Sequence, residues 1–264
     1  MRAAAFSLEV MLFMIQDIIT MIQDFITNFA DKFYKTFIVD DRWKYLTNGL
    51  KNTIVITLFA VMLGIVLGFL IAIVRSTHDK TGKLKFLNVL AKIYLTVIRG
   101  TPVVVQLLII YFVIFASVSV DKIFAAVLAF GLNSAAYVAE IVRSGIMSVD
   151  NGQFEAGSSL GLNYAQTMMY IIIPQAFKNV LPSLANECIV LLKETSVAGY
   201  IAVQDLTKGG DTIRSATYEP FMPLIAVAII YLVIVMVLTH FVTKLERRLA
   251  ANDKRCLLYT SPSP

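Results

Sequence analysis

The sequence of 264 residues has few charged residues, two cysteines, two histidines and one tryptophan. Charged residues make up 16% of the chain, against roughly 25% in soluble globular domains. Two cysteines, Cys188 and Cys256, make no disulfide framework and have no metal-ligand spacing. No Gly-rich phosphate loop, HExxH or GxSxG motif occurs. We therefore expect no catalytic residue, no metal and no cofactor on this chain. The net charge of +5 is modest, and we expect no nucleic-acid partner.

Apolar residues are abundant instead, at 58% of the chain, and the mean hydropathy is +0.74. They gather in blocks long enough to cross a bilayer, which takes roughly 20 helical residues. The second block extends backward through Ile93–Ile98, and the fourth reaches membrane length only if it starts near Ile171, because it contains Pro182 and Glu187. The sequence thus predicts an all-α membrane protein with five transmembrane helices, at residues 52–74, 100–120, 123–139, 179–192 and 220–243.

Residues 8–33 have a different pattern. Their apolar positions recur every three or four residues, which indicates a helix. Asp17, Asp24 and Asp31 lie on the opposite face, so this N-terminal amphipathic helix is too polar to span. Its polar face is acidic, unlike the Lys/Arg-rich face of typical membrane-surface helices. The residues leave open whether it lies on the membrane lipid or packs against the bundle.

Basic residues flanking the predicted spans indicate the orientation. The loop after the first span and the segment after the fifth are both rich in lysine and arginine. Five crossings then place the N-terminus outside and the C-terminus in the cytoplasm. We expect an extracytoplasmic segment at 1–45, a transmembrane domain at 46–250 and a tail at 251–264. The final "CLLYTSPSP" has neither helical period nor charge, which suggests a non-native end. On the outer side, "TKGGD" at 207–211 predicts a turn.

The stretch "DNGQFEAGSSLGLNYAQTMMYIIIP" at 150–174 interrupts the apolar chain. Asp150 favours the start of a short helix, and Glu155 is expected in its first turn, where negative charge suits the helix dipole. Gly161 favours its end, and Asn163 can cap a second helix that Pro174 kinks or breaks. From these residues alone, the stretch is either a connecting loop or a small helix at about 151–162 that a partner's groove encloses.

The spacing of this stretch resembles the EAA motif of ABC importer permeases. That pattern is Glu-Ala-Ala, three residues, Gly, nine residues and Ile-x-Leu-Pro. Gly157 and Ile173 depart from it, replacing alanine and leucine. Further segments are similar to the polar amino acid branch of the family, over roughly residues 43–248, namely "RGTPVVVQL" (99–107), "SAAYVAEIVRSGI" (134–146), "NGQFEAGSSLG" (151–161), "PQAFKNVLPSLANECIVLLKETSV" (174–197) and "QDL" (204–206).

The resemblance implies a type I ABC importer permease fold in a bacterial cell membrane. It further implies a second permease copy or a paralogue, an extracytoplasmic amino-acid-binding protein, and an ABC ATPase dimer that carries the ATP and Mg. The short cytoplasmic helix would then couple to that ATPase. The residues that would couple, by their match to the motif, are Glu155, Ala156, Gly157, Gly161 and Pro174.

Polar residues inside the predicted spans are candidates for the substrate pathway, because an ionisable group in a span usually faces a cavity or a partner. They are Arg99, Asn133, Asn186 and Glu187. Glu187 has a structural alternative, as a partner of Lys178 or Lys193. Arg99 could instead only extend to the interface. We expect Glu140 and Arg143 to pair with each other, since they are three residues apart on a helix.

Two other functions remain open from the sequence. A secondary transporter is disfavoured, because five spans contain no inverted halves. A membrane sensor or scaffold that recruits an ATPase without transport is the alternative from a different class.

Overall fold

The computed structural model describes residues 2–258, with side-chain surroundings from Gln16 to Leu249 except at Ile18. The proposed non-native tail, 256–264, and the first residues of the predicted amphipathic helix therefore lie outside the residues whose side chains are described. The described chain forms helices and contains no strand. Its longer helices are α1 (Arg2–Phe33), α2 (Trp43–Thr81), α3 (Lys85–Gly100), α4 (Val103–Ile109), α5 (Lys122–Met147), α6 (Asn151–Ser159), α8 (Ile173–Glu194), α9 (Leu206–Thr217) and α10 (Phe221–Leu258).

Short helical turns join these helices. The four-residue α7 and the π turn η4 run without a break into α8. Two further π turns and two 3-10 turns complete the set, which comprises η1 (Tyr34–Ile38), η2 (Val39–Asp41), η3 (Ile110–Ile114), α7 (Tyr164–Thr167), η4 (Met168–Ile172) and η5 (Thr195–Ile201). The prediction of an all-α protein is confirmed.

The most extensive helix contact is between α2 and α5, and small residues make it possible. A Cβ added at Gly64 would lie 2.9 Å from Ser134 Cβ, and one at Gly68 would lie 2.5 Å from Val138 Cγ1. Small side chains allow helix backbones to approach closely in membranes. This contact, the α2–α5 seam, is part of a stripe of buried residues on α2 at steps of three or four. The first two members, Gly49 and Thr53, meet Asp205 and Leu206 at the start of α9. The whole stripe comprises Gly49, Thr53, Thr57, Ala60, Gly64, Gly68, Ala72 and Ser76.

The seam fixes the direction of the helices. Gly64 meets Ser134 and Gly68 meets Val138, four residues further along each helix, so α2 and α5 run parallel. On the other side of α5, Gly145 packs against Val180 of α8. Because Ser134 also reaches Glu187, α8 runs antiparallel to α5.

The predicted second span, residues 100–120, is wrong as one continuous helix. The chain bends by 110° between α3 and α4, and the helix ends at η3. Pro102 has no N–H to continue the helix, and the residue before proline favours an extended backbone. Gln106 stabilises the break: its Nε2 donates to the carbonyl oxygens of Ile98 (2.7 Å) and Thr101 (3.0 Å).

The number of spans stays a prediction. By length and apolar composition, α2, α5 and α10 up to Leu249 can each cross a membrane, and the bent pair of α3 with α4 and η3 gives a fourth. The predicted fourth span lies in α8, which contains Lys178, Glu187 and Lys193 and is more polar than these helices.

The turn predicted at 207–211 is wrong, because this stretch lies inside α9. Its glycines serve close packing: a Cβ at Gly209 would lie 2.5 Å from the Tyr45 carbonyl oxygen of α2. The buried Asp205 caps the helix by accepting hydrogen bonds from Thr207 N and Lys208 N. Leu206 N donates to Thr53 Oγ1 at 3.1 Å, so α9 is fastened to the start of α2.

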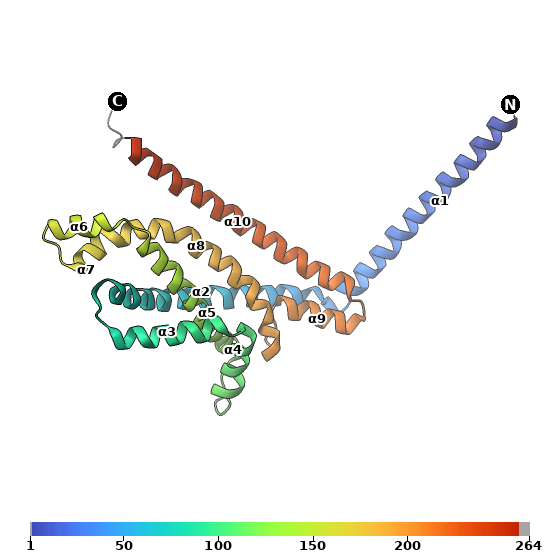
Figure 1. The fold of residues 1–264 in the computed structure, drawn as a ribbon. Coiled ribbons are helices and arrows are strands. Elements are labelled where there is room, and N and C mark those ends of the chain that lie inside the picture. Colours follow the sequence, from blue (N-terminus) through green and yellow to red (C-terminus); the bar gives the residue numbers. More distant parts are fainter. Residues whose placement is uncertain (1, 259–264) are drawn as a thin grey trace.

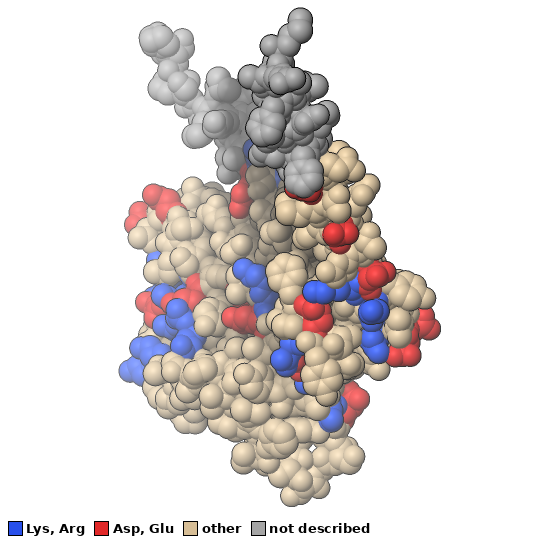
Figure 2. All heavy atoms as spheres, turned by 90° about the vertical axis from the view of Figure 1, so that its right-hand side faces the viewer, with Lys and Arg blue, Asp and Glu red and all other residues tan. Residues whose placement is uncertain are grey.

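The molecule therefore has two distinct ends, which we call the α6 end and the α9 end (Figure 1). Helix α1 projects away from the bundle at the α9 end. Seen from the α9 end, charged residues of both signs gather across the middle of the surface, and a broad uncharged area lies below them (Figure 2).

The close packing at the seam predicts that replacing glycine by alanine destabilises the protein at some positions and not at others. In Gly68→Ala the new methyl group meets Val138, and overpacking of this kind costs about 1–3 kcal/mol. That cost exceeds the gain of about 1 kcal/mol in helix propensity. Gly100→Ala is the matched control, because a Cβ there has no neighbour within 4 Å. We expect thermal unfolding of the detergent-purified protein to shift down only for Gly68→Ala. Equal shifts in both variants would argue against close packing at the seam.

Candidate functional site

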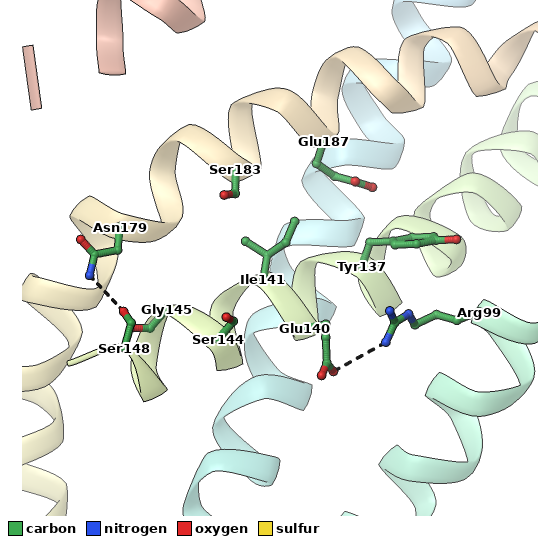
Figure 3. A pocket seen from close by; sticks show the side chains of 10 residues that line it. All are labelled: Arg99, Tyr137, Glu140, Ile141, Ser144, Gly145, Ser148, Asn179, Ser183 and Glu187. Atoms are coloured by element: carbon green, nitrogen blue, oxygen red, sulfur yellow. Dashed lines mark hydrogen bonds and ion pairs between the residues drawn. The ribbon is translucent and has the colours of Figure 1, made fainter. Parts of the chain in front are cut away.

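A cavity of about 520 Å3 opens between α3, α5 and α8 towards the α6 end. Figure 3 shows its lining: Arg99 comes from α3, a row of residues from α5 and its end, and three residues from α8. Most of these side chains are small or polar, so this central cavity suits a polar guest. The lining residues are Arg99, Tyr137, Glu140, Ile141, Ser144, Gly145, Ser148, Asn179, Ser183 and Glu187.

Glu187 lies at the α8 side of the central cavity. Its Oε1 accepts a hydrogen bond from Ser134 Oγ at 3.1 Å. The described partner is thus an uncharged hydroxyl on the α2–α5 seam. A carboxylate held by one neutral donor keeps acceptor capacity for a cationic group, which is what a binding residue in a cavity requires.

Arg99 reaches the cavity from the last turn of α3, beside the break at Pro102. Its guanidinium lies 5.8 Å from the centre of the Tyr137 ring and 4.0 Å from Glu140 Oε2. The side chain is 45% exposed. Arg99 is therefore oriented by its neighbours and still accessible from the cavity.

At the wall of the central cavity, ion pairs join α2, α3 and α5. Glu140 is at the centre: its carboxylate binds Arg75 of α2 at 2.9 Å and Arg143 at 3.0 Å. Arg143 also lies 3.5 Å from Asp79 of α2. The expected Glu140–Arg143 pair is confirmed. Sequence reasoning missed Arg75 and Asp79 as its partners, because only the parallel packing of α2 and α5 brings them together.

The other two pathway candidates lie outside the cavity lining. Asn133 is 3% exposed, and its Nδ2 donates to Glu194 Oε2 at 3.3 Å. Asn186 is exposed on α8 and is not among the residues that line the cavity. The structure thus brings Arg99 and Glu187 together around one cavity and leaves the two asparagines apart from it.

The stretch 150–167 forms a second candidate site, which we call the elbow. Asp150 caps α6 through Gly152 N at 2.6 Å, as predicted. Gly161 has a φ of +79°, in the left-handed region that favours glycine. Asn163 and Gln166 form a capping box at α7. The predicted place of Glu155 is wrong, since it lies just beyond the first turn of α6.

Within the elbow, α6 packs on α7 through Gly157. A Cβ at Gly157 would lie 2.6 Å from Thr167 Cγ2 and 2.7 Å from its Oγ1. Gly157 stands where the EAA pattern has alanine, and Thr167 fills the space that the methyl group of that alanine would occupy. By contrast, Glu155 and Ala156 are exposed, so they form an outward surface on a well-packed helix.

The elbow is fastened to the body by residues that sequence reasoning missed. Lys80 Nζ of α2 donates to Asn151 Oδ1 at 2.6 Å and lies 4.7 Å from the centre of the Phe154 ring. Phe154 in turn stacks on Tyr164, with ring centres 6.3 Å apart. Two aromatic residues ten apart in an otherwise polar stretch were the available indication in the sequence.

Pro174 does not break the helix as the sequence allowed. It lies in the first turn of α8, directly after the π turn η4. Such a turn relocates one set of backbone hydrogen bonds, which accommodates a residue that has no N–H. The elbow is thus continuous with α8, the helix that carries Glu187.

The α9 end has a shallow cavity of about 300 Å3, lined by Gly199, Tyr200, Lys208 and Asp211. Hydrogen bonds from Lys208 and Arg214 hold the pKa of the Asp211 carboxyl below its usual value. Their nitrogens lie 2.8 and 2.5 Å from its oxygens. This end therefore offers fixed charges of both signs. Among the side chains that the structure describes, no three potential metal ligands come together.

Comparison with known proteins shows the family to which the chain belongs. Residues 64–251 match the family described as binding-protein-dependent transport system inner membrane component. The arginine transport system permease protein ArtQ of Bacillus subtilis (strain 168) is 37% identical over 79% of this chain and 94% of its own length. The glutamine transport system permease protein GlnP of Escherichia coli (strain K12) is 37% identical over 77% and 92%.

Two solved structures share the fold. One is a crystal structure of an amino acid ABC transporter with histidines, 41% identical, with a TM-score of 0.72 over 80% of this chain and 96% of that one. The other, the methionine ABC transporter MetNI in an inward-facing conformation, has a TM-score of 0.69 over 78% and 97%. At 16% identity it supports the fold alone.

The elbow predicts coupled substitutions. Gly157→Ala alone should clash with Thr167 and loosen α6 by about 1–2 kcal/mol. Amide hydrogen exchange of α6, followed by mass spectrometry, should then be roughly tenfold faster. Adding Thr167→Ala removes both clashing atoms and should restore slow exchange. If exchange in the double variant stays as fast as in Gly157→Ala alone, the two positions are not coupled.

Proposed function

The chain belongs to the family of binding-protein-dependent transport system inner membrane components, and from this premise we propose that it is the permease subunit of an ATP-driven importer of polar amino acids. Its curated relatives are named as arginine and glutamine permeases. The observation that carries the proposal is a polar cavity connected by one continuous helix to an exposed elbow. The chain provides the pathway, and we assign ATP hydrolysis, with its Mg, to a separate ATPase dimer.

The elbow is the proposed contact with that ATPase. Glu155 and Ala156 form part of its exposed surface, and Leu160 at its tip is 77% exposed. Gly157 holds α6 on α7, Gly161 makes the turn, and Pro174 begins the helix that leads to the cavity. A groove on the ATPase that encloses α6 would move the elbow as one unit, and the movement would reach α2 through Lys80 and α8 through η4.

The central cavity is the proposed substrate pathway. An amino acid carries an ammonium and a carboxylate group. Glu187 can accept hydrogen bonds from the ammonium group, and Arg99 can pair with the carboxylate, an arrangement in which charge-assisted bonds fix orientation. Asn133 and Asn186 remain proposed pathway residues for a state in which α5 and α8 are arranged differently.

The topology supports an orientation in a bacterial plasma membrane. With the elbow in the cytoplasm, parallel α2 and α5 begin outside, so the N-terminus is outside and the C-terminus inside. The α9 end then faces an extracytoplasmic amino-acid-binding protein. A second copy of this chain or a paralogue completes the pathway. The alternative of a sensor or scaffold that recruits an ATPase without transport has no support among the relatives.

Uptake in proteoliposomes tests the function. The chain, its ATPase and its binding protein should take up one or a few polar amino acids when ATP is supplied to the elbow side. Glu187→Gln should lower uptake at limiting substrate by roughly tenfold or more, the value of one charged hydrogen bond. Glu246→Gln, at an exposed glutamate of α10 outside the cavity lining, is the control. ATPase docking without any uptake would favour the scaffold instead.

The elbow assignment predicts weaker binding of the ATPase in two variants. Glu155→Lys reverses an exposed charge on α6. Gly161→Val strains the backbone, because its φ of +79° disfavours other residues even where a side chain has space. We expect both proteins in the membrane but reduced co-purification of the ATPase. Glu246→Lys is the control, because it also reverses the charge of an exposed glutamate, in the C-terminal part of α10 and outside the elbow. Full co-purification and uptake in both variants would refute the assignment.

A further inference from the structure

Helix α1 presents an apolar face that the described chain leaves open. From Gln16 to Phe33, every side chain that the structure describes is exposed. Phe25 is 70% exposed and Ile26 59%. A contiguous apolar surface of this extent indicates an interaction site, whereas single exposed apolar side chains are common on any protein. The residues of this α1 face are Ile19, Ile22, Phe25, Ile26, Phe29 and Phe33.

A seven-residue repeat produces the face. Residues 15–21, 22–28 and 29–35 read "IQDIITM", "IQDFITN" and "FADKFYK". In the first two repeats the first, fourth and fifth positions are apolar, and aspartate occupies the third position of all three. Three apolar positions per repeat make a stripe at least about 100° wide, and Asp17, Asp24 and Asp31 lie on the other side.

The pattern distinguishes between possible partners of the α1 face. A two-helix coiled coil uses two apolar positions per repeat and places charged residues at the flanking fifth and seventh positions. Here the fifth position holds Ile19, Ile26 and Phe33, and the seventh holds Met21, Asn28 and Lys35. The α1 face is therefore wider, and more apolar at its edge, than the contact surface of a two-helix coiled coil. A face of this width is suited to contact with the acyl region of a lipid bilayer.

The α1 face is continuous with the apolar surface of a spanning helix. Phe25 and Phe29 line a cavity of about 320 Å3 together with Phe221 and Met222 at the start of α10. From there Phe221, Leu224 and Ile225 lead along α10 as exposed apolar residues. Lys32 of α1 lies 3.7 Å from Glu219, two residues before α10 begins.

The base of α1 is fixed at the level where spans leave the membrane. Thr36 and Phe37 of η1 are buried, so the connection is anchored at the α9 end. Trp43 and Tyr45, at the start of α2, are 44% and 42% exposed. Amphipathic aromatic rings of this kind sit at the headgroup level. A helix rooted there, with one apolar face, has the bilayer interface directly beside it.

We propose that α1 lies in the interface of the bilayer at the α9 end, with the α1 face in the acyl boundary and the aspartates in water. The ligand is a neutral lipid surface, because the acidic stripe gives no attraction to anionic headgroups. This inference depends on the chain being embedded in a membrane. It does not depend on which substrate the chain transports or whether the elbow binds an ATPase.

Tryptophan quenching by brominated lipid tests the proposal on the full chain. Trp43 is the single tryptophan, so Trp43→Phe gives a silent background. Phe25→Trp then places an indole on the α1 face, and Gln23→Trp, on the polar side, is the matched control. In phosphatidylcholine vesicles with bromine at stepped acyl depths, Phe25→Trp should be quenched most at a depth of roughly 5–10 Å, and Gln23→Trp only weakly.

Three results would overturn the proposal. Equal quenching of the two variants would mean that α1 has no preferred face towards lipid. Absent quenching of Phe25→Trp would mean that protein, such as a second copy, covers the α1 face. Strongest quenching by bromine near the bilayer centre would mean that α1 crosses the membrane. Replacing part of the phosphatidylcholine by anionic phosphatidylglycerol should leave the quenching unchanged or lower it, because the aspartates repel anionic headgroups, and an increase would contradict a neutral surface.

Discussion

Close contact between α2 and α5 is the constraint on which the other helices depend. Glycine, alanine, serine and threonine remove the side-chain bulk that normally separates two helices, so the backbones approach and the helices are held parallel. Two consecutive parallel spans require a return path, which α3 and α4 supply. Parallel packing also places the charged ends of α2 and α5 together, where Arg75 meets Glu140. The elbow follows α5 and is therefore beside the end of α2.

The central cavity exists because two of the helices around it are irregular or polar. The bend at Pro102 ends α3 and leaves Arg99 at the cavity edge. Helix α8 carries polar side chains on the face that meets α5, including Ser183 and Glu187. Lipid would make such a face costly, whereas a cavity between helices accommodates it. The same helix connects through η4 to the elbow, so cavity and elbow share one backbone.

Local features could be predicted from the sequence, and long-range ones could not. The elbow followed from turn chemistry: Asp150 caps, Gly161 adopts a positive φ and Asn163 caps again. The packing of Gly64 and Gly68 against α5 could not be predicted, since such a contact depends on the partner helix. "TKGGD" was assigned to a turn because glycine favours both turns and close packing, and only the tertiary fold decides between them. Of the four pathway candidates, Arg99 and Glu187 line the cavity, whereas Asn133 and Asn186 do not. This difference depends on how the helices pack, which could not be read from a single sequence.

The contact between Lys80 and α6 has a consequence for the chemical environment in which the elbow works. The partners of the ammonium group, the Asn151 amide and the Phe154 ring, are both uncharged and in direct contact. Salt screens the attraction between two charges, and here the ammonium group has no charged partner, so dissolved ions have no charge–charge attraction to weaken. An ion pair at the surface would weaken as salt rises. The attachment of α6 to α2 is therefore buffered against the ionic strength of the solution that surrounds it.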